Sequence, residues 1–535
     1  MPEMHFRVRW PNGATVNCYS PSYIIEEYLT VGQSYPVPEF LERTRAALNI
    51  ASERVREKYG FACSSALDQL SVIEETASAL SPEQHTQSVL VLDFEKHAAR
   101  DARAKSGTQE RREHHTVLVV GGGQAGLSVS YHLKQRGIDH LVLEGRRVAH
   151  SWRDERWDTF CLVTPNWQCQ LPGYPYAGPD PQGFMLKDQI VEYVEGYKKA
   201  FDLPVREGVM VEALNELSDS SPARFELVTS HGVFTAEQVV VATGAYHKAF
   251  LPPYAKEIPE HVVTQHSSSY KNPESLPAGA VLVVGSGQSG AQIAEDLHLA
   301  GREVHLAVGN APRCARRYRG RDVVEWLADL GYYDIPIDQH PNREQVRDKT
   351  NHYVTGRDGG RDIDLRKMAV EGMKLYGPLS TVTAGVAEFK PELKQNLDSA
   401  DNVYRSINRT IDAYIEKAGV SAPQEADYAP PWEPESEPVT LDLLAAGVTS
   451  ILFCAGFASD FSWVKPPVLD GRGFPIHERG VTATDGLYFI GLPWLHTWGS
   501  GRFSGVGRDA DYIVSHLAQL LQTQSASEPL GAASA

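Results

Sequence analysis

The chain has 535 residues, 42% of them hydrophobic, and its 51 Lys and Arg against 68 Asp and Glu give a formal net charge of −17. This length suggests about three domains, and the negative charge argues against broad nonspecific binding to nucleic acid or anionic lipid. No apolar run approaches the roughly 18 residues of a membrane span, and residues 1–10 carry charges in place of a signal-peptide core. We therefore expect a cytoplasmic protein that binds neither nucleic acid nor a membrane.

The cysteines and histidines show no ligand or disulfide pattern. The 19 histidines contain no HExxH or comparable spacing, so we expect no metal site. The cysteines include no CxxC pair, which is typical of buried or free thiols in a reducing compartment. The six cysteines are Cys18, Cys63, Cys161, Cys169, Cys314 and Cys454.

Residues 1–80 predict a small α+β module. Alternating apolar residues over 4–10, followed by an Asn-Gly turn, indicate a β-hairpin. Apolar residues then recur at helical spacing over 38–59 and 65–79. Residues 81–113 become polar and charged, which predicts a linker. A nucleic-acid-binding arm is the less favoured alternative, because acidic residues are interspersed and no aromatic residues interleave to stack on bases.

Residues 114–144 predict a first dinucleotide-binding unit. A short apolar run precedes three glycines in the pattern GxGxxG, and an amphipathic stretch follows, as a strand, turn and helix require. The glycines permit a tight turn, close approach of a pyrophosphate, and close packing of helix and strand. A second strand ends in an acidic residue about 20 residues later, where a carboxylate can accept from a ribose hydroxyl. The residues assigned to this cofactor are Gly121, Gly123, Gln124, Ala125, Gly126 and Glu144.

Aromatic residues gather after this unit, beginning with Trp152, Trp157 and Phe160. They form either ordinary core or the walls around a flat cofactor ring such as an isoalloxazine, which needs apolar surfaces and a few polar contacts. A buried strand over 237–241 then leads into Gly244, where small residues let the backbone pass close to a cofactor.

A second GxGxxG follows the apolar run at 281–284, again with a helix and a strand after it. Two such units predict two dinucleotides. No acidic residue stands at the end of the second strand, and arginines follow, which favours the 2′-phosphate of NADP; solvated surface arginines are the alternative. The residues assigned to this cofactor are Gly285, Gly287, Gln288, Ser289, Gly290, Arg313 and Arg316.

Apolar residues at helical spacing predict a long amphipathic helix ending near Gly419, and a strand at 451–453 is expected to resume the first domain. The fold class is therefore α/β, with two Rossmann-like dinucleotide-binding domains, the first of them discontinuous, and a small α+β N-terminal module. The expected divisions are a module at 1–80, a linker at 81–113, the first cofactor domain at 114–252 and 450–522, the second cofactor domain with a helical elaboration at 253–449, and a disordered tail at 523–535.

The motifs form an ordered set over about residues 114–522: GGGQAG at 121–126 with Glu144 and Trp152, VVVATG at 239–244, His266 with Tyr270, GSGQSG at 285–290, CAGF at 454–457 and GLYFIG at 486–491. This set resembles the flavin-containing monooxygenases, which carry FAD and NADPH domains on one chain. Residues 1–80 resemble a small family of nitrogen-starvation response proteins that tends to occur beside such flavoproteins, which implies a role in nitrogen metabolism.

The resemblance implies that NADPH reduces FAD, that dioxygen adds to give a C4a-(hydro)peroxyflavin, and that one oxygen passes to a soft nucleophile, for which we expect an amine nitrogen. It assigns Gly491, with the residues of the first unit and Trp152, to FAD, and the second unit to NADPH. His496 and Trp498, in the loop after Gly491, are candidate walls of the substrate pocket. The sequence identifies no catalytic residue.

Two other functions stay open. A flavin-dependent amine oxidase or dehydrogenase would remove hydride from an amine and return the electrons to oxygen. A redox or nitrogen-status sensor would report through the N-terminal module to a protein partner. Disulfide reductases share the double fold but need a CxxC beside the flavin, and the sequence has none. The expected partners are a small-molecule substrate and dioxygen, and a homo-oligomer is compatible with the sequence.

Overall fold

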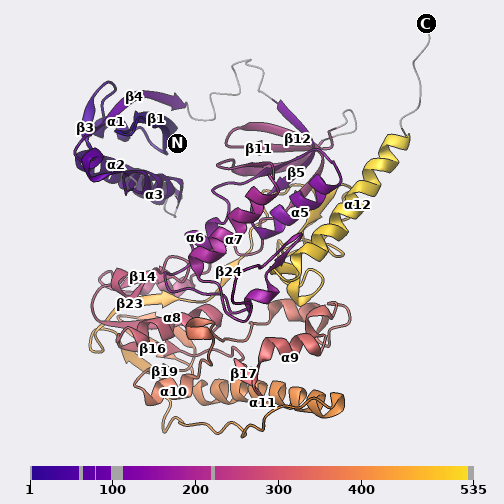
Figure 1. The fold of residues 1–535 in the computed structure, drawn as a ribbon. Coiled ribbons are helices and arrows are strands. Elements are labelled where there is room, and N and C mark those ends of the chain that lie inside the picture. Colours follow the sequence, from indigo (N-terminus) through magenta and orange to yellow (C-terminus); the bar gives the residue numbers. More distant parts are fainter. Residues whose placement is uncertain (1–2, 60–63, 79, 98–111, 218–222, 528–535) are drawn as a thin grey trace. The chain divides into compact units, whose positions relative to one another are not determined.

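The computed structural model describes residues 3–59, 64–78, 80–97, 112–217 and 223–527. The chain forms two compact units, residues 1–110 and 111–535, and Figure 1 labels many of their elements. Within the described residues no helix is long and apolar enough to cross a membrane.

The first unit is a four-stranded antiparallel sheet in the order β2-β1-β4-β3, with helices packed against it. The predicted hairpin and both predicted helices are confirmed as β1, β2, α2 and α3. The prediction of a linker over 81–113 is wrong for residues 82–97, because α4 and β4 lie there and β4 pairs with β1; residues 98–111 lie outside the described residues. The elements are β1 (Glu3–Arg9), β2 (Thr15–Ser20), α1 (Ile25–Tyr28), β3 (Ser34–Pro36), α2 (Val37–Tyr59), α3 (Ser64–Ser78), α4 (Pro82–His85) and β4 (Ser88–His97).

The second unit is built on two large sheets, with smaller sheets beside them. The first has the order β10-β11-β12-β5-β6-β9, with β25 also paired to β12. Strand β5 begins at Arg112, so residues 112 and 113 belong to a strand and not to the predicted linker. The elements of this sheet and its helices are β5 (Arg112–Val120), α5 (Gln124–Gln135), β6 (His140–Leu143), α6 (His150–Arg153), α7 (Lys187–Ala200), β9 (Val205–Arg206), β10 (Val211–Glu216), β11 (Phe225–Thr229), β12 (Gly232–Val241), β25 (Leu487–Phe489) and α12 (Val506–Ser527).

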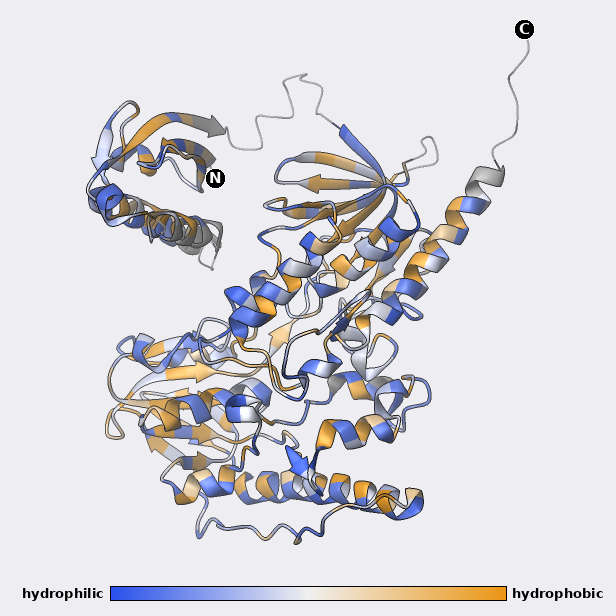
Figure 2. Cartoon of the chain, viewed as in Figure 1, coloured by the Kyte–Doolittle hydropathy of each residue, from blue (hydrophilic) through white to orange (hydrophobic). Residues whose placement is uncertain are grey.

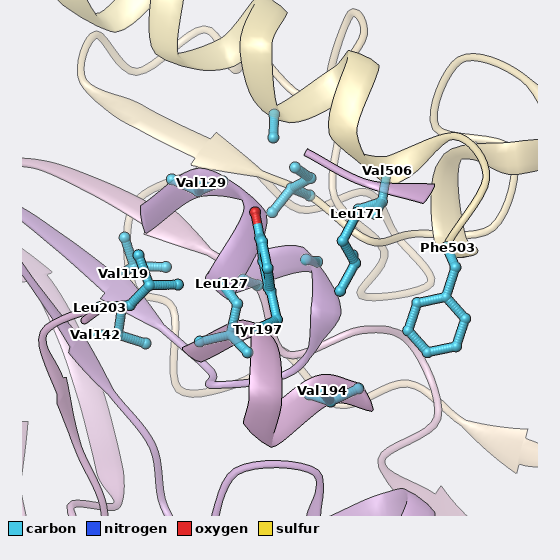
Figure 3. Packing of buried hydrophobic residues seen from close by; sticks show 14 of the residues in the cluster. Val119, Leu127, Val129, Val142, Leu171, Val194, Tyr197, Leu203, Phe503 and Val506 are labelled. Carbon is cyan, nitrogen blue, oxygen red and sulfur yellow. The ribbon is translucent and has the colours of Figure 1, made fainter. Parts of the chain in front are cut away.

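The core of this first domain lies where β5 and β6 meet three helices. Helices α5, α7 and α12 lie side by side in Figure 1, and α5 packs on both of the others. Figure 3 shows Val119 of β5, Leu127 of α5 and Tyr197 of α7 converging, and all three are fully buried. Burying each such aliphatic or aromatic side chain contributes roughly 1.5–3 kcal/mol, so this packing fixes where the turn between β5 and α5 lies.

The second sheet is wholly parallel, in the order β14-β23-β15-β16-β19. Figure 2 colours much of this sheet as hydrophobic, and its central strand β15 is buried along its whole length, as a parallel strand covered on both faces should be. Its elements are β14 (Val263–His266), β15 (Ala280–Val284), α8 (Gln288–Leu299), β16 (Val304–Ala307), α9 (Val323–Asp329), α10 (Leu365–Val370), β19 (Lys374–Tyr376), α11 (Leu393–Ala418) and β23 (Val448–Phe453), and a small sheet of β20 (Leu379–Thr383), β21 (Val386–Phe389) and β22 (Thr440–Asp442) lies beside them.

The long helix α11 ends as predicted, with Gly419 in the left-handed conformation at its C-terminus. The strand at 451–453 was expected in the first domain, but β23 pairs with β14 and β15 of the second sheet. A short buried run does not specify which sheet it joins, so only tertiary pairing decides this. Helix α12 continues to Ser527, past the expected start of the tail, and residues 528–535 lie outside the described residues.

Candidate active site

The first glycine turn joins β5 to α5, and its backbone geometry requires glycine at two positions. Gly121 has a φ of 110°, and a Cβ there would lie 2.7 Å from the carbonyl oxygen of Ala242, which follows β12. A Cβ at Gly126 would lie 1.9 Å from the carbonyl oxygen of Gly121. The first glycine therefore lets the turn pass β12, and the third lets α5 lie against the turn.

The start of α5 has backbone N–H groups that no side chain caps. Gly123 is its N-cap and no side chain caps the helix, so its first backbone N–H groups are available to a phosphate. Glu144, at the end of β6, accepts hydrogen bonds from the Gly122 N–H at 2.6 Å and the Arg146 N–H at 2.8 Å. The carboxylate is thereby held beside the turn, where a ribose hydroxyl would meet it.

The second glycine turn, between β15 and α8, repeats this geometry. Gly285 has a φ of 103°, and a Cβ there would lie 2.8 Å from the carbonyl oxygen of Cys454. A Cβ at Gly290 would lie 1.8 Å from the carbonyl oxygen of Gly285. The N-cap of α8 is Gly287, again without a side-chain cap, and Ser289 lies in its first turn. The chain thus has two glycine turns of equivalent geometry, one for each sheet.

Small residues keep the first turn close to the end of β25. A Cβ at Gly491 would lie 2.8 Å from the Cβ of Ala125, so glycine lets this loop touch α5. Gly244 has a φ of 72°, and a Cβ there would meet no atom within 4 Å, so space is open beside the strand end. Gly491 therefore permits close packing on α5, whereas Gly244 leaves room beside the strand end for a bound cofactor.

A cavity of about 150 Å³ lies between the starts of α5 and α8. Gln124 and Gln288, the first residues of the two helices, both line it, together with Trp152. The Trp152 ring stacks on Phe503 at a centroid distance of 5.7 Å and lies 6.0 Å from Phe160. The structure therefore brings the predicted Gln124, Trp152 and Gln288 to one place, and the aromatic residues form walls.

The cavity also presents polar groups without partners. Among the described residues, the Oε1 atom of Gln168 and the Oγ atom of Ser504 are buried and make no hydrogen bond, and both residues line the cavity. Buried polar atoms are normally satisfied, so these atoms fit a ligand with polar edges. Flat aromatic walls and a few polar atoms suit an isoalloxazine ring. Sequence patterns gave no signal for Gln168, Arg502 or Ser504, whereas Gln292 could have been found from its helical spacing to Gln288.

His496 and Trp498 do not line the cavity. Trp498 packs on Tyr333 at a centroid distance of 4.5 Å, and its ring lies 3.7 Å from the guanidinium carbon of Arg502, which does line it. The His496 carbonyl accepts a hydrogen bond from the Ile337 N–H at 2.7 Å. Both residues therefore join the loop after Gly491 to the second domain, behind the cavity wall.

The predicted role of Arg313 and Arg316 in binding a 2′-phosphate does not fit the structure. Both side chains are buried. Arg313 donates to Asp401 at 2.8 Å, and Arg316 donates to Asp322 at 2.5 Å. Nearby carboxylates such as Asp364 raise the Arg313 pKa although burial opposes this. The sequence showed arginines after β16 but not the distant carboxylates that pair with them.

His266 and Tyr270, which belong to the motif set that resembles the flavin-containing monooxygenases, make contacts within the protein. His266 forms a 3.0 Å hydrogen bond with the Gly456 carbonyl, and the Tyr270 hydroxyl donates to Asp296 at 2.7 Å. Burial raises the pKa of the Cys454 thiol to about 12, which keeps it protonated at neutral pH.

Two family models match the chain. The model of the pyridine nucleotide-disulphide oxidoreductases matches residues 118–363, and the model of the nitrogen starvation-induced protein NitG matches residues 5–94. The second match ends within β4, which agrees with the correction of the linker.

Two relatives and a solved structure are similar to large parts of this chain. An uncharacterized CzcO-like oxidoreductase of Geobacillus kaustophilus is 34% identical over 75% of this chain and 97% of its own. The indole-3-pyruvate monooxygenase YUCCA1 of Oryza sativa is 32% identical over 38% of this chain and 50% of its own. The structure of a flavin-containing monooxygenase from Stenotrophomonas maltophilia covers 76% of this chain and 99% of its own, with 18% identity and a TM-score of 0.53, and so shares the fold.

Proposed function

The chain belongs to the family of flavin-dependent oxidoreductases that includes the CzcO-like proteins and the flavin-containing monooxygenases, and we propose that it oxygenates a small soft nucleophile. Its cofactors are FAD and NADPH. The first candidate for the oxygenated atom is an amine nitrogen. In the balanced reaction NADPH, a proton, dioxygen and substrate give NADP⁺, water and the oxygenated substrate. The bound flavin supplies the redox chemistry.

The cavity between the two glycine turns carries this proposal. The starts of α5 and α8 each offer free backbone N–H groups to one dinucleotide, and Gln124 and Gln288 bring both starts to one cavity. Two cofactors bound there would meet at their reactive ends. The role of this chain is then to bind and orient both rings between Trp152, Phe160 and Phe503 and to exclude water.

The cysteines argue against disulfide reduction, although such enzymes share the family model. The sequence has no CxxC. Burial raises the pKa values of Cys161 and Cys169, the described cysteines closest in sequence to the cavity residues. A thiol that stays protonated is a poor nucleophile for disulfide exchange, which leaves oxygen transfer as the better supported reaction.

The test is a two-step experiment on FAD-loaded protein. NADPH is mixed anaerobically and bleaching of the flavin absorbance is followed; labelled dioxygen is then admitted with a panel of small amines and thioethers. We expect NADPH to bleach the flavin and label to appear in one product. Bleaching by an amine alone, with NADPH and NADH both inert, would move the function to an amine oxidase or dehydrogenase.

We propose a nitrogen-linked role for the first unit, because residues 5–94 match the NitG model. Deletion of residues 1–111 tests whether this unit takes part in turnover. Unchanged NADPH oxidation would leave it a recruiting role towards a protein partner. Loss of turnover, with FAD still bound, would make it part of the catalytic assembly or of a sensor.

A further inference from the structure

Arg502 lines the cavity but is held by neutral groups. Its Nη1 atom donates to the carbonyl oxygen of Trp498, and its Nη2 atom donates to Oδ1 of Asn351 at 2.9 Å. The Trp498 ring lies 3.7 Å from the guanidinium carbon. These contacts fix the side chain without neutralising its charge.

Several other arginines of the second unit have acidic partners, whereas Arg156, which lies over the Trp152 and Phe160 rings, donates to the Glu155 carbonyl. Arg313 pairs with Asp401, Arg316 with Asp322, and Arg508, six positions after Arg502, with Asp334. Arg502 forms no ion pair within the described part of the chain. Burial lowers its pKa, and the groups that oppose this shift are tyrosine hydroxyls, with no carboxylate among them. A partly buried charge without a counter-ion is unfavourable, so the site is incomplete without an anion.

The guanidinium has donors left for such an anion. Arginine carries five N–H donors in a planar fork, and the structure uses two of them. The Nε atom makes no hydrogen bond to described residues, and it is not among the buried unpaired atoms. The planar fork of an arginine matches the two oxygens of a carboxylate better than the point charge of a lysine ammonium does.

We propose that Arg502 binds the carboxylate of the substrate, so that the enzyme acts on small carboxylate-bearing nucleophiles whose remaining part lies beside the cofactor rings. This inference deepens the proposed function and rests on it. An anionic oxygen could also come from a cofactor phosphate or from the reduced flavin ring, and the experiment separates these sources.

The probes are benzoate and its neutral isostere benzamide, titrated into oxidised FAD-loaded protein while the flavin absorbance spectrum is recorded. We expect wild-type protein to bind benzoate about tenfold or more tightly than benzamide, since a hydrogen bond to a charged group contributes that much. Arg502→Met should reduce this preference to about one, and Arg502→Lys should retain part of it. Arg508→Met, which removes a more exposed cation nearby, is the matched control and should leave the preference unchanged.

Equal affinity of wild-type protein for the two probes, including no binding of either, would overturn the proposal. So would an unchanged benzoate preference in Arg502→Met, whether or not that variant loses affinity for FAD or NADP⁺ or shifts the flavin reduction potential. Retained FAD content shows that each variant folds. The titration needs neither NADPH nor dioxygen, so its failure is separate from a failure of NADPH-driven oxygenation.

Discussion

The ring of Tyr333, from the segment after α9, lies against the ring of Trp498, from the loop after β25, with their centroids 4.5 Å apart. This contact joins the two cofactor domains behind the cavity. In the same loop, the His496 carbonyl accepts a hydrogen bond from the Ile337 N–H, and the Arg502 guanidinium donates one to the Asn351 side chain. The second domain thus closes one side of the cavity through contacts with a single loop.

Trp498→Ala should therefore let water reach the flavin. An aromatic pair of this kind contributes about 0.5–1.5 kcal/mol beyond its buried area, so we expect the protein to fold and to keep FAD. The ratio of hydrogen peroxide released to NADPH oxidised should rise, because oxygen activation is no longer shielded from water. Tyr333→Phe, which keeps the ring, is the control and should match wild-type protein. An unchanged peroxide ratio in Trp498→Ala would show that this contact does not seal the site.

Two glycines of the first turn should respond differently to alanine. Gly126→Ala places a Cβ 1.9 Å from the Gly121 carbonyl oxygen, and no side-chain movement relieves a clash with backbone, so we expect protein without bound FAD or no soluble protein. Gly123→Ala meets no atom within 4 Å, so it should fold and show weaker FAD binding through loss of space for the pyrophosphate. Expression, circular dichroism and FAD titration measure both. Equal behaviour of the two variants would contradict the assigned roles.

Arg313→Met should lower stability without changing the choice of nicotinamide cofactor. Removing one partner of a buried ion pair costs about 3–5 kcal/mol, and Asp401 would be left without this charge. The ratio of kcat/KM for NADPH and NADH should equal that of wild-type protein, because the side chain is buried. Arg409→Met, exposed on the same domain, should change stability by less than about 0.5 kcal/mol. A marked shift of the cofactor ratio in Arg313→Met would restore the prediction made from the sequence.

Stability should fall with acid through His477. Burial lowers its pKa to about 4, whereas the unfolded chain titrates near about 6.5. Between these values the unfolded state binds more protons, so this contribution is complete above the unfolded pKa and is lost as pH falls towards the folded one. The full difference is of the order of 3 kcal/mol. Urea unfolding midpoints of wild-type and His477→Gln protein between neutral pH and pH 4 should converge on acidification; parallel curves would exclude this role.

Local sequence patterns determined the two cofactor turns. Gly121, Gly126, Gly285 and Gly290 were identifiable because the steric demand on each comes from a turn within a few residues of the glycine and from an adjacent strand end. Helix α11 and the Gly419 that ends it were equally predictable from the sequence, since helical periodicity is a local property.

Only the tertiary structure decided which distant residues meet. Strand β23 reads as a buried run that either sheet could accept, and its pairing with β14 and β15 depends on the whole second domain. The buried partners of Arg313 and the approach of Asn351 to Arg502, which are 151 positions apart, leave no mark on local periodicity. The sequence therefore determined the cofactor-binding turns, while long-range packing decided which charges are neutralised and which remains open at the cavity.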